Sequence, residues 1–441
     1  MKKRLVLAAL LCLLLTLAAC GGGPPGAGEQ GTEPAETGEK RQLRISVCYD
    51  YYALETPIAR FNEIHPDVEI ILNKYDNDTV GYQQQVSTQL LSGAADDLLD
   101  ATRLNDRRMR NSGLLADIYP LMENDPDFKE ADYYMNVLDA MAKDGQLTVF
   151  PTSFGYELAA VNNTFSPELV AAYQQYDRVS YWDLFALYSG LGDTGGRYLG
   201  NNFDAATSMF ANMDAFIDHE TRTCSFDSPE FIDFITMAKA GTEPGKTINQ
   251  VYGFDCRSTA DWQAYALRYV FACAESSNYS ALLPYADEQF THFVPLTDWE
   301  GKVSLMLSKS FCINAASPNQ DLAWEFLKFL TTPEANADIH IPGLPIHREL
   351  CRDHIETNLA RSAERYSKDI PLSCSADEAV QQLLAQYLAW NDLPMAYRQV
   401  YYGLVDTDET LETLIAFHDG TLSAAQAASM LQNRVSLFLM E

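Results

Sequence analysis

The sequence predicts an α/β fold with enough chain for two domain-sized cores. Residues 43–47 alternate apolar and polar side chains, a pattern typical of a strand. A helix should follow, because Ile58 and Phe61 share one face and Pro66 then stops the pattern. Residues 68–72 form a second apolar strand. Strand, helix and strand in this order begin an α/β sheet, and about 400 residues suffice for two cores.

Further elements can be placed along the chain. Residues 82–91 predict a helix, and residues 98–99 lead into a short strand. Residues 317–320, Ser-Pro-Asn-Gln, predict a helix start in which Ser317 caps the first turn and Gln320 closes a capping box. The Gly-rich polar segment 190–202 is expected to form loops.

The N-terminus has the features of an export signal. Three basic residues, at positions 2–4, precede an apolar run of 15 residues, 5–19. At about 1.5 Å per residue this run is too short to cross a ~30 Å hydrocarbon core, so residues 1–19 predict a signal peptide. The tetrapeptide Leu-Ala-Ala-Cys that ends at Cys20 resembles a bacterial lipobox, which implies cleavage before Cys20 and attachment of diacylglycerol to its sulfur. The alternative is an ordinary signal peptide with an incidental cysteine.

A flexible tether should follow over residues 20–41. It contains no large apolar cluster that could offset the entropy of ordering it. The whole chain has 61 acidic and 31 basic residues, a formal net charge of −30. Such a charge disfavours nucleic acid and anionic headgroups, and it suits a lipid-anchored body held off the bilayer.

The sequence contains only weak matches to nucleotide-binding and metal-binding motifs. Residues 240–247, AGTEPGKT, match a permissive phosphate-loop pattern, but a helix precedes them and a proline inside them lacks an N–H. His347, Cys351 and His354 have the spacing of one helical face and could hold Zn²⁺, yet no fourth ligand is evident, so two surface histidines beside a buried cysteine are expected. We therefore expect no catalytic residue, no metal and no cofactor.

Two other patterns carry no catalytic meaning. The adjacent pair Asp96 and Asp97 is expected by chance in so acidic a chain. Seven cysteines follow Cys20, an odd number without a CxxC pair, so most should be small buried residues rather than a disulfide framework. They are Cys48, Cys224, Cys256, Cys273, Cys312, Cys351 and Cys374. One or two disulfides remain open, because the predicted compartment is extracytoplasmic.

Four stretches carry a resemblance to a known family. They are 58–72 (IARFNEIHPDVEIIL), 112–118 (SGLLADI), 226–232 (FDSPEFI) and 312–330 (CINAASPNQDLAWEFLKFL). These stretches resemble the family 1 extracellular solute-binding proteins, the maltose-binding-protein-like class. The resemblance implies a two-lobe periplasmic-binding-protein-like fold, with a hinge of two or three crossing segments and the ligand between the lobes.

The resemblance also implies lobe boundaries. The N-terminal lobe would comprise residues 42–152 plus 297–345, and the C-terminal lobe residues 153–296 plus 346–441. Crossings are expected near 150–154 and 293–296, with a third near 343–345.

Ligand contacts are expected where the first strand ends. Tyr49, Asp50 and Tyr51 follow this strand directly, at the sheet edge where α/β proteins bind ligands. Aromatic rings stack on the C–H faces of sugars, although each tyrosine could instead pack against its lobe. The other candidates rest on the resemblance or on nearness to a crossing; they are Asn105, Asp106, Phe154, Tyr156 and Trp262.

The resemblance implies a function. The chain would capture a small solute, most readily an oligosaccharide, and deliver it to the permease of an ABC transporter. It would act as a monomer on the outer face of the cytoplasmic membrane, anchored through Cys20. The alternatives are a ligand-sensing lipoprotein for a membrane receptor and a lipid-anchored glycoside hydrolase.

The anchor can be tested directly. If Cys20 carries the lipid, Cys20→Ala should move the protein from the membrane fraction to the soluble fraction, because the tether alone has no membrane affinity. Cys12→Ala, which lies inside the predicted signal, serves as the control and should stay in the membrane fraction. Fractionation and immunoblotting measure both, and unchanged membrane association of Cys20→Ala would contradict the anchor.

Overall fold

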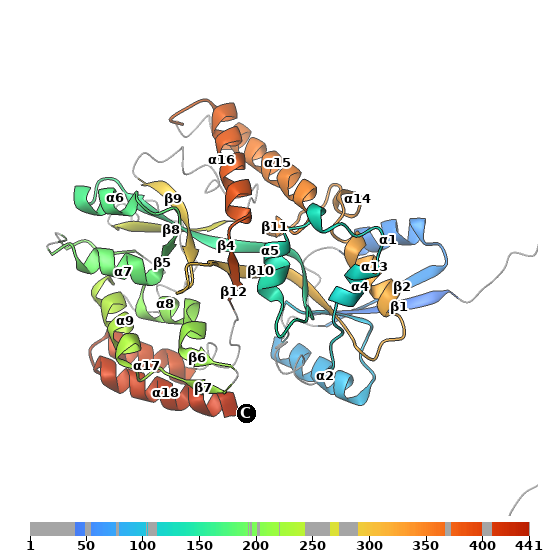
Figure 1. Cartoon of the computed structure of the whole chain (residues 1–441), viewed down its shortest axis with the longest axis horizontal. Coiled ribbons are helices and arrows are strands. Elements are labelled where there is room, and N and C mark those ends of the chain that lie inside the picture. Colours follow the sequence, from blue (N-terminus) through green and yellow to red (C-terminus); the bar gives the residue numbers. More distant parts are fainter. Residues whose placement is uncertain are drawn as a thin grey trace, which may run out of the picture. The chain divides into compact units, whose positions relative to one another are not determined.

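The computed structural model describes most of the chain after residue 39 (Figure 1). The described residues are 40–48, 54–75, 79–102, 104, 113–192, 194, 196–200, 203–219, 221–242, 265–272, 290–366, 372–398 and 408–440. Among them, no helix has both the length and the apolar character needed to cross a membrane.

Ten strands of the described residues form one mixed sheet. Its main path runs β11 (Leu344–Pro345), β4 (Phe150–Asn162), β9 (Phe290–Thr297), β10 (Val303–Ile313), β3 (Leu98–Asp100), β1 (Arg41–Val47) and β2 (Val68–Lys74). Three strands pair off this path: β12 (Met395–Tyr397) with β10, β5 (Val179–Ser180) with β9, and β8 (Leu267–Ala272) with β4. A separate hairpin joins β6 (Ile217–Asp218) to β7 (Thr223–Cys224). β1 is parallel to β2 and β3, whereas β10 is antiparallel to β3 and β4.

A first hydrophobic cluster surrounds β1, β2 and β3. Its helices are α1 (Glu55–Ile64), α2 (Thr79–Ser92), α4 (Tyr119–Glu123), α5 (Met135–Met141), α13 (Gln320–Phe329), α14 (Pro333–Asn336), α15 (Arg348–Tyr366) and α16 (Ala376–Asn391). The buried face of α13 packs on α1, where the Phe61 ring lies 5.1 Å from Phe326 and 5.3 Å from Phe329, centroid to centroid. The short helix η1 (Glu130–Asp132) precedes α5.

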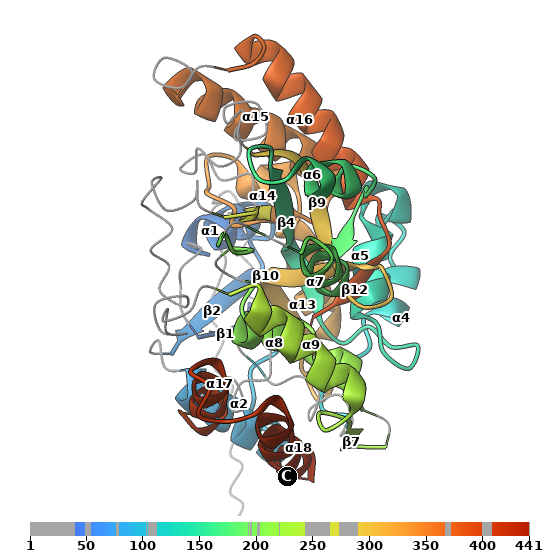
Figure 2. The same ribbon diagram turned by 90° about the vertical axis from the view of Figure 1, so that its left-hand side faces the viewer.

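A second cluster is built from the middle and the end of the chain. It contains α6 (Pro167–Tyr173), α7 (Tyr181–Ser189), α8 (Ala205–Ala211), η2 (Met213–Phe216), α9 (Pro229–Ala240), α17 (Asp408–His418) and α18 (Ala424–Met440). Figures 1 and 2 both show α17 and α18, in dark red, beside α8 and α9. The C-terminal helices therefore complete a core that begins some 250 residues earlier in the sequence.

The strand β4 belongs to both clusters. Leu158 and Ala160 point into the first cluster, whereas Ala159 and Val161 point into the second. This alternation follows from the strand geometry, in which successive side chains leave opposite faces. β9 also contributes to both clusters, with Phe290 and Phe293 in the first and Val294 and Leu296 in the second. Both clusters are thus packed on the same strands.

The chain passes from the first cluster to the second only near its C-terminal end. Leu344 and Ile346 stay in the first cluster, as do the buried residues of α15 and α16, and the chain reaches the second cluster only between Tyr397 and Leu411. The sequence had suggested a crossing near 343–345. The lobe boundaries remain a prediction, and boundaries that follow the packing would place 346–397 with the first cluster.

The local elements agree with the sequence, with one correction. The predicted strands 43–47 and 68–72 and the helices through Phe61 and residues 82–91 are confirmed. The predicted capping box at Ser317 is wrong, because α13 begins at Gln320. The Ser317 hydroxyl instead donates to Asp97 at 2.5 Å, and Gln320 donates to the Ala315 carbonyl. The Ser317 hydroxyl also accepts the Asn319 N–H at 3.0 Å, so the box fails at Gln320, whose side chain does not return to Ser317.

Candidate functional site

The expected ligand edge lies where β1 and β3 end. The two strands are parallel, with Ile45 opposite Leu98, so their carboxyl ends reach the same edge. The candidates that follow these ends fall outside the described residues, as does the candidate near the second crossing. They are Tyr49, Asp50, Tyr51, Asn105, Asp106 and Trp262. The structure therefore describes the strand ends that border this edge.

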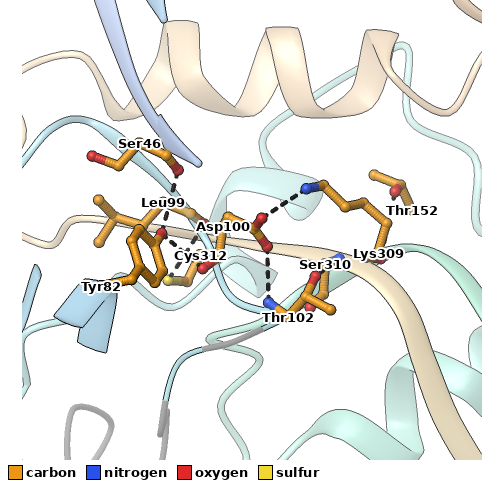
Figure 3. Close-up of polar contacts among 9 residues, drawn as sticks. All are labelled: Ser46, Tyr82, Leu99, Asp100, Thr102, Thr152, Lys309, Ser310 and Cys312. Carbon is orange, nitrogen blue, oxygen red and sulfur yellow. Dashed lines mark hydrogen bonds and ion pairs between the residues drawn. The ribbon is translucent and has the colours of Figure 1, made fainter. Parts of the chain in front are cut away.

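Asp100, the last residue of β3, joins the end of this strand to β10 and to α2 (Figure 3). Its side chain is buried and accepts a hydrogen bond from Lys309 Nζ at 2.7 Å and one from the Thr102 backbone N–H at 3.0 Å. Tyr82 on α2 donates its hydroxyl proton to the Asp100 carbonyl at 2.9 Å. Burial, with the Asp100 charge beside it, raises the pKa of Tyr82 well above its usual range, so the phenol stays a donor.

Lys309 reaches Asp100 from β10. Its ammonium also lies 5.1 Å from the centroid of the Phe311 ring. Next to it, the Ser310 N–H donates to Thr102 Oγ1 at 3.1 Å, and the Ala101 N–H donates to the Ser310 carbonyl at 2.9 Å. The chain that leaves β3 is thereby attached to β10. Because both charged side chains are at most 6% exposed, neither can lose its partner without a large desolvation penalty.

A second, partly buried ion pair lies on β4. Arg398, just after β12, donates through both Nη atoms to the Glu157 carboxylate of β4, at 2.8 and 3.0 Å. The Arg398 backbone N–H donates to the Leu305 carbonyl of β10 at 3.0 Å. This bidentate arrangement fixes the end of β12 against both β4 and β10.

Two ligand candidates lie inside the core. Phe154 is fully buried, with its ring 5.8 Å from that of Tyr134. Tyr156 is also fully buried, and its hydroxyl donates to Asn391 Oδ1 of α16 at 2.9 Å. Neither ring reaches solvent here, so a ligand contact from either would need this packing to open, and both stay predictions.

Cys351 and His354, two of the three residues with the spacing of a zinc site, have different hydrogen-bond partners. Cys351 is fully buried, which raises the pKa of its thiol to about 12, and Asn391 Nδ2 lies 3.5 Å from its sulfur. His354 pairs with Asn358 at 3.0 Å, and burial lowers the pKa of the imidazole to about 4. Within the described ranges, no three His, Cys, Asp or Glu side chains gather as metal ligands. Cys48 and Cys312 are buried, as expected.

The paired carboxylates Asp96 and Asp97 serve as connectors between strands. Asp96 accepts from Ser46 Oγ at 2.5 Å and from Asn73 Nδ2 at 2.8 Å. Asp97 accepts from Ser317 Oγ and from the Arg44 N–H. Their acceptor groups are engaged inside the first cluster, which gives them a structural role.

A pocket of about 360 Å³ lies elsewhere, between elements of the two clusters. Its walls come from the end of α5, from α8 and η2, from the β9–β10 turn and from β12. Phe154 and Tyr156, the two predicted ligand residues that the structure describes, do not line it.

The comparisons with known proteins identify the family. A family model described as bacterial extracellular solute-binding protein matches residues 57–346, more than half of the chain. The chain belongs to this family. It is therefore an extracellular solute-binding protein, and such proteins bind rather than catalyse, which sets the glycoside hydrolase aside. Membership also implies association with an ABC importer.

Solved structures agree on the fold. A family 1 extracellular solute-binding protein from Alicyclobacillus acidocaldarius subsp. acidocaldarius DSM 446 is 13% identical, with a TM-score of 0.58 over 92% of this chain and 100% of that one. The sugar-binding protein MalE from Xanthomonas citri is 15% identical, with a TM-score of 0.57 over 90% and 97%. An oligogalacturonide-binding protein from Yersinia enterocolitica is 15% identical, with a TM-score of 0.54 over 90% and 99%. A search among curated protein sequences finds no match.

The expected fold class is confirmed. At these identities the likeness establishes the fold, a mixed α/β architecture shared with periplasmic solute-binding proteins. The ion pairs were missed by the sequence analysis. A signal for them was present, because Asp100, Glu157 and Lys309 are each the single charged residue of their strand.

The Asp100–Lys309 pair can be tested through stability. Lys309→Met should lower the free energy of unfolding by about 3–5 kcal/mol, because it leaves Asp100 buried and unpaired. Adding Asp100→Asn should restore much of the loss, since the remaining side chain is then neutral.

The matched control is the exposed pair of Arg41 with Asp321, 2.9 Å apart. Arg41→Met should change stability by at most about 1 kcal/mol. Urea denaturation followed by circular dichroism measures all four proteins. Equal effects of Lys309→Met and Arg41→Met would contradict the role given to the buried pair.

Proposed function

We propose that this solute-binding protein captures a carbohydrate, an oligosaccharide in particular, at the carboxyl edge of β1 and β3, and delivers it to an ABC importer permease. In this proposal a lipid on Cys20 holds the protein at the outer face of the cytoplasmic membrane. The proposed ligand position rests on one observation. The parallel strands β1 and β3 end at the same edge of the sheet, where the Asp100–Lys309 pair joins β3 to β10.

The strand geometry supports this position. Parallel strands present their carboxyl ends to one edge, where loops leave the sheet and side chains can converge on a ligand. Tyr49, Asp50 and Tyr51 follow the last buried residues of β1, and Asn105 and Asp106 follow β3 by a few residues. Aromatic faces with neighbouring carboxylate and amide groups are the combination that recognises a sugar.

The relatives support the ligand class. Two of the structures with the same fold are named as binding proteins for a sugar and for an oligogalacturonide. The chain is also rich in rings that can stack on sugars, with 24 tyrosines and 5 tryptophans.

The packing supports capture by closure. The two clusters are separate cores that share β4 and β9, and the chain passes between them once more after Tyr397. Separate cores on common strands can rotate about those strands while each core stays intact. A ligand that binds the closed arrangement better shifts the population toward it, and a permease can then distinguish filled from empty protein.

The ligand class and the edge are tested together. A thermal-shift screen against a glycan library should find carbohydrates that raise the melting temperature, since binding to the native state adds RT ln(1 + [L]/Kd) to stability. With the best ligand, alanine at a stacking tyrosine should weaken affinity about five- to thirty-fold, or roughly 1–2 kcal/mol.

Tyr49, Tyr51 and Tyr52 form the comparison set. If the strand direction continues, Tyr49 and Tyr51 share one face and Tyr52 points to the other. Alanine substitutions on the face toward the ligand should then weaken affinity, and substitutions on the opposite face should lower stability. Isothermal titration calorimetry and thermal melts separate the two effects. Loss of stability alone at all three positions would show that this edge is packing, and a library without any stabilising glycan would contradict the carbohydrate.

A further inference from the structure

The 360 Å³ pocket has the size of a small-molecule site. Such sites span about 300–1,000 Å³ and often lie between separately packed parts of a chain. This pocket exists because small side chains face one another across it. They are five alanines from α5 and the residue after it, from α8, from η2 and from β12: Ala140, Ala142, Ala211, Ala215 and Ala396.

Most of the charges around the pocket already have partners. Three ion pairs contribute to its walls, with nitrogen–oxygen distances of 2.8, 2.9 and 2.8 Å: Lys302–Glu300, His219–Asp214 and Arg398–Glu157. An ionic ligand would have to compete with these pairs. A neutral ligand with several hydroxyl groups can instead accept from and donate to the fixed polar groups without separating them.

One aromatic ring of the wall is held in place yet open to solvent. Trp299, in the β9–β10 turn, is 46% exposed. Its ring lies 5.0 Å from the ring of Trp182 and 5.8 Å from that of Phe216, centroid to centroid. Asp298 rigidifies the turn, because its Oδ1 accepts the backbone N–H groups of Glu300 and Lys302 at 2.9 and 2.8 Å. A fixed, exposed indole is a suitable face for the C–H groups of a sugar ring.

We propose that this pocket is a second ligand site, which takes a neutral carbohydrate of one or two sugar units with Trp299 as its stacking face. Among the described residues, none of β1 or β3 lines the pocket, so the inference does not depend on the ligand assigned to their edge. Because the walls come from elements of both clusters, occupancy of the pocket would also bias how the clusters are arranged, and any coupling to the edge would be reciprocal.

Fluorine NMR of the full chain labelled with 5-fluorotryptophan tests the proposal. The chain has 5 tryptophans, and Trp299→Phe identifies the Trp299 resonance by its absence. Glucose, maltose and cellobiose are titrated as neutral probes, and sodium sulfate as an ionic one. We expect a neutral sugar to shift the Trp299 resonance saturably, while sulfate leaves it in place.

A pair of matched variants locates the binding. Ala215→Phe puts a ring into the pocket wall from η2, and Ala131→Phe makes the same change at an exposed alanine of η1 that does not line the pocket. The sugar-dependent shift of Trp299 should weaken about tenfold or more in Ala215→Phe and persist in Ala131→Phe.

Three results would overturn the inference: no neutral sugar shifts Trp299, the shift survives in Ala215→Phe, or sulfate alone produces it. Trp262, the ligand candidate near the second crossing, reports separately on the site of the proposed function, and Trp262→Phe identifies its resonance. A sugar that shifts Trp262 but not Trp299 would refute the second site and leave the proposed function standing. A shift of Trp299 alone, lost in Ala215→Phe, would support the second site whatever ligand the edge takes.

Discussion

Two ion pairs, one buried and one partly buried, join the strands of the central sheet. β4 and β10 pair antiparallel, from Phe150 opposite Phe311 to Gly155 opposite Met306. Lys309 of β10 is bound to Asp100 of β3, and Glu157 of β4 is bound to Arg398 after β12. A buried charge without its partner is strongly unfavourable, so the pairs define which strands lie together and in which register.

This constraint explains how one sheet can carry two cores. Leu158, Ala159, Ala160 and Val161 of β4 point in turn to the first and second clusters, so a register shift of one residue would exchange the side chains that each core receives. Close-packed cores resist internal deformation, and the flexible connections are therefore the places where the shared strands enter and leave. Such an arrangement suits a protein whose task is to bind a solute between two parts and present the result to a partner.

Local patterns in the sequence were sufficient for the local structure. Alternation predicted β1 and the spacing around Phe61 predicted α1, whereas the first turn of α13 was predicted wrongly. The Ser317 hydroxyl donates to Asp97, 220 residues away in the chain, and still accepts the Asn319 N–H at 3.0 Å, but Gln320 bonds the Ala315 carbonyl and does not close the box. Local capping rules do not include these other partners of the two side chains.

The candidate site shows the same limit. Proximity to a crossing suggested Phe154 and Tyr156 as ligand contacts, but α16 covers Tyr156, and the Tyr134 ring covers Phe154. The ion pairs join residues 209 and 241 positions apart, and no pattern within one element reveals such partners. The family resemblance, in contrast, could be read from short stretches, because their buried faces and turns are local.

The central claim is that the β4–β9 pair is the rigid element common to both cores, and hydrogen exchange tests it most directly. The amides of residues 158 to 161 in β4 and of Phe293, Val294 and Leu296 in β9 should exchange more slowly than those of α2 and α18, because they open only when both cores open. Their protection should rise further when a stabilising solute is added, because such a solute adds RT ln(1 + [L]/Kd) to the free energy of global opening. Exchange in β4 and β9 as fast as in α2 and α18 would contradict the account.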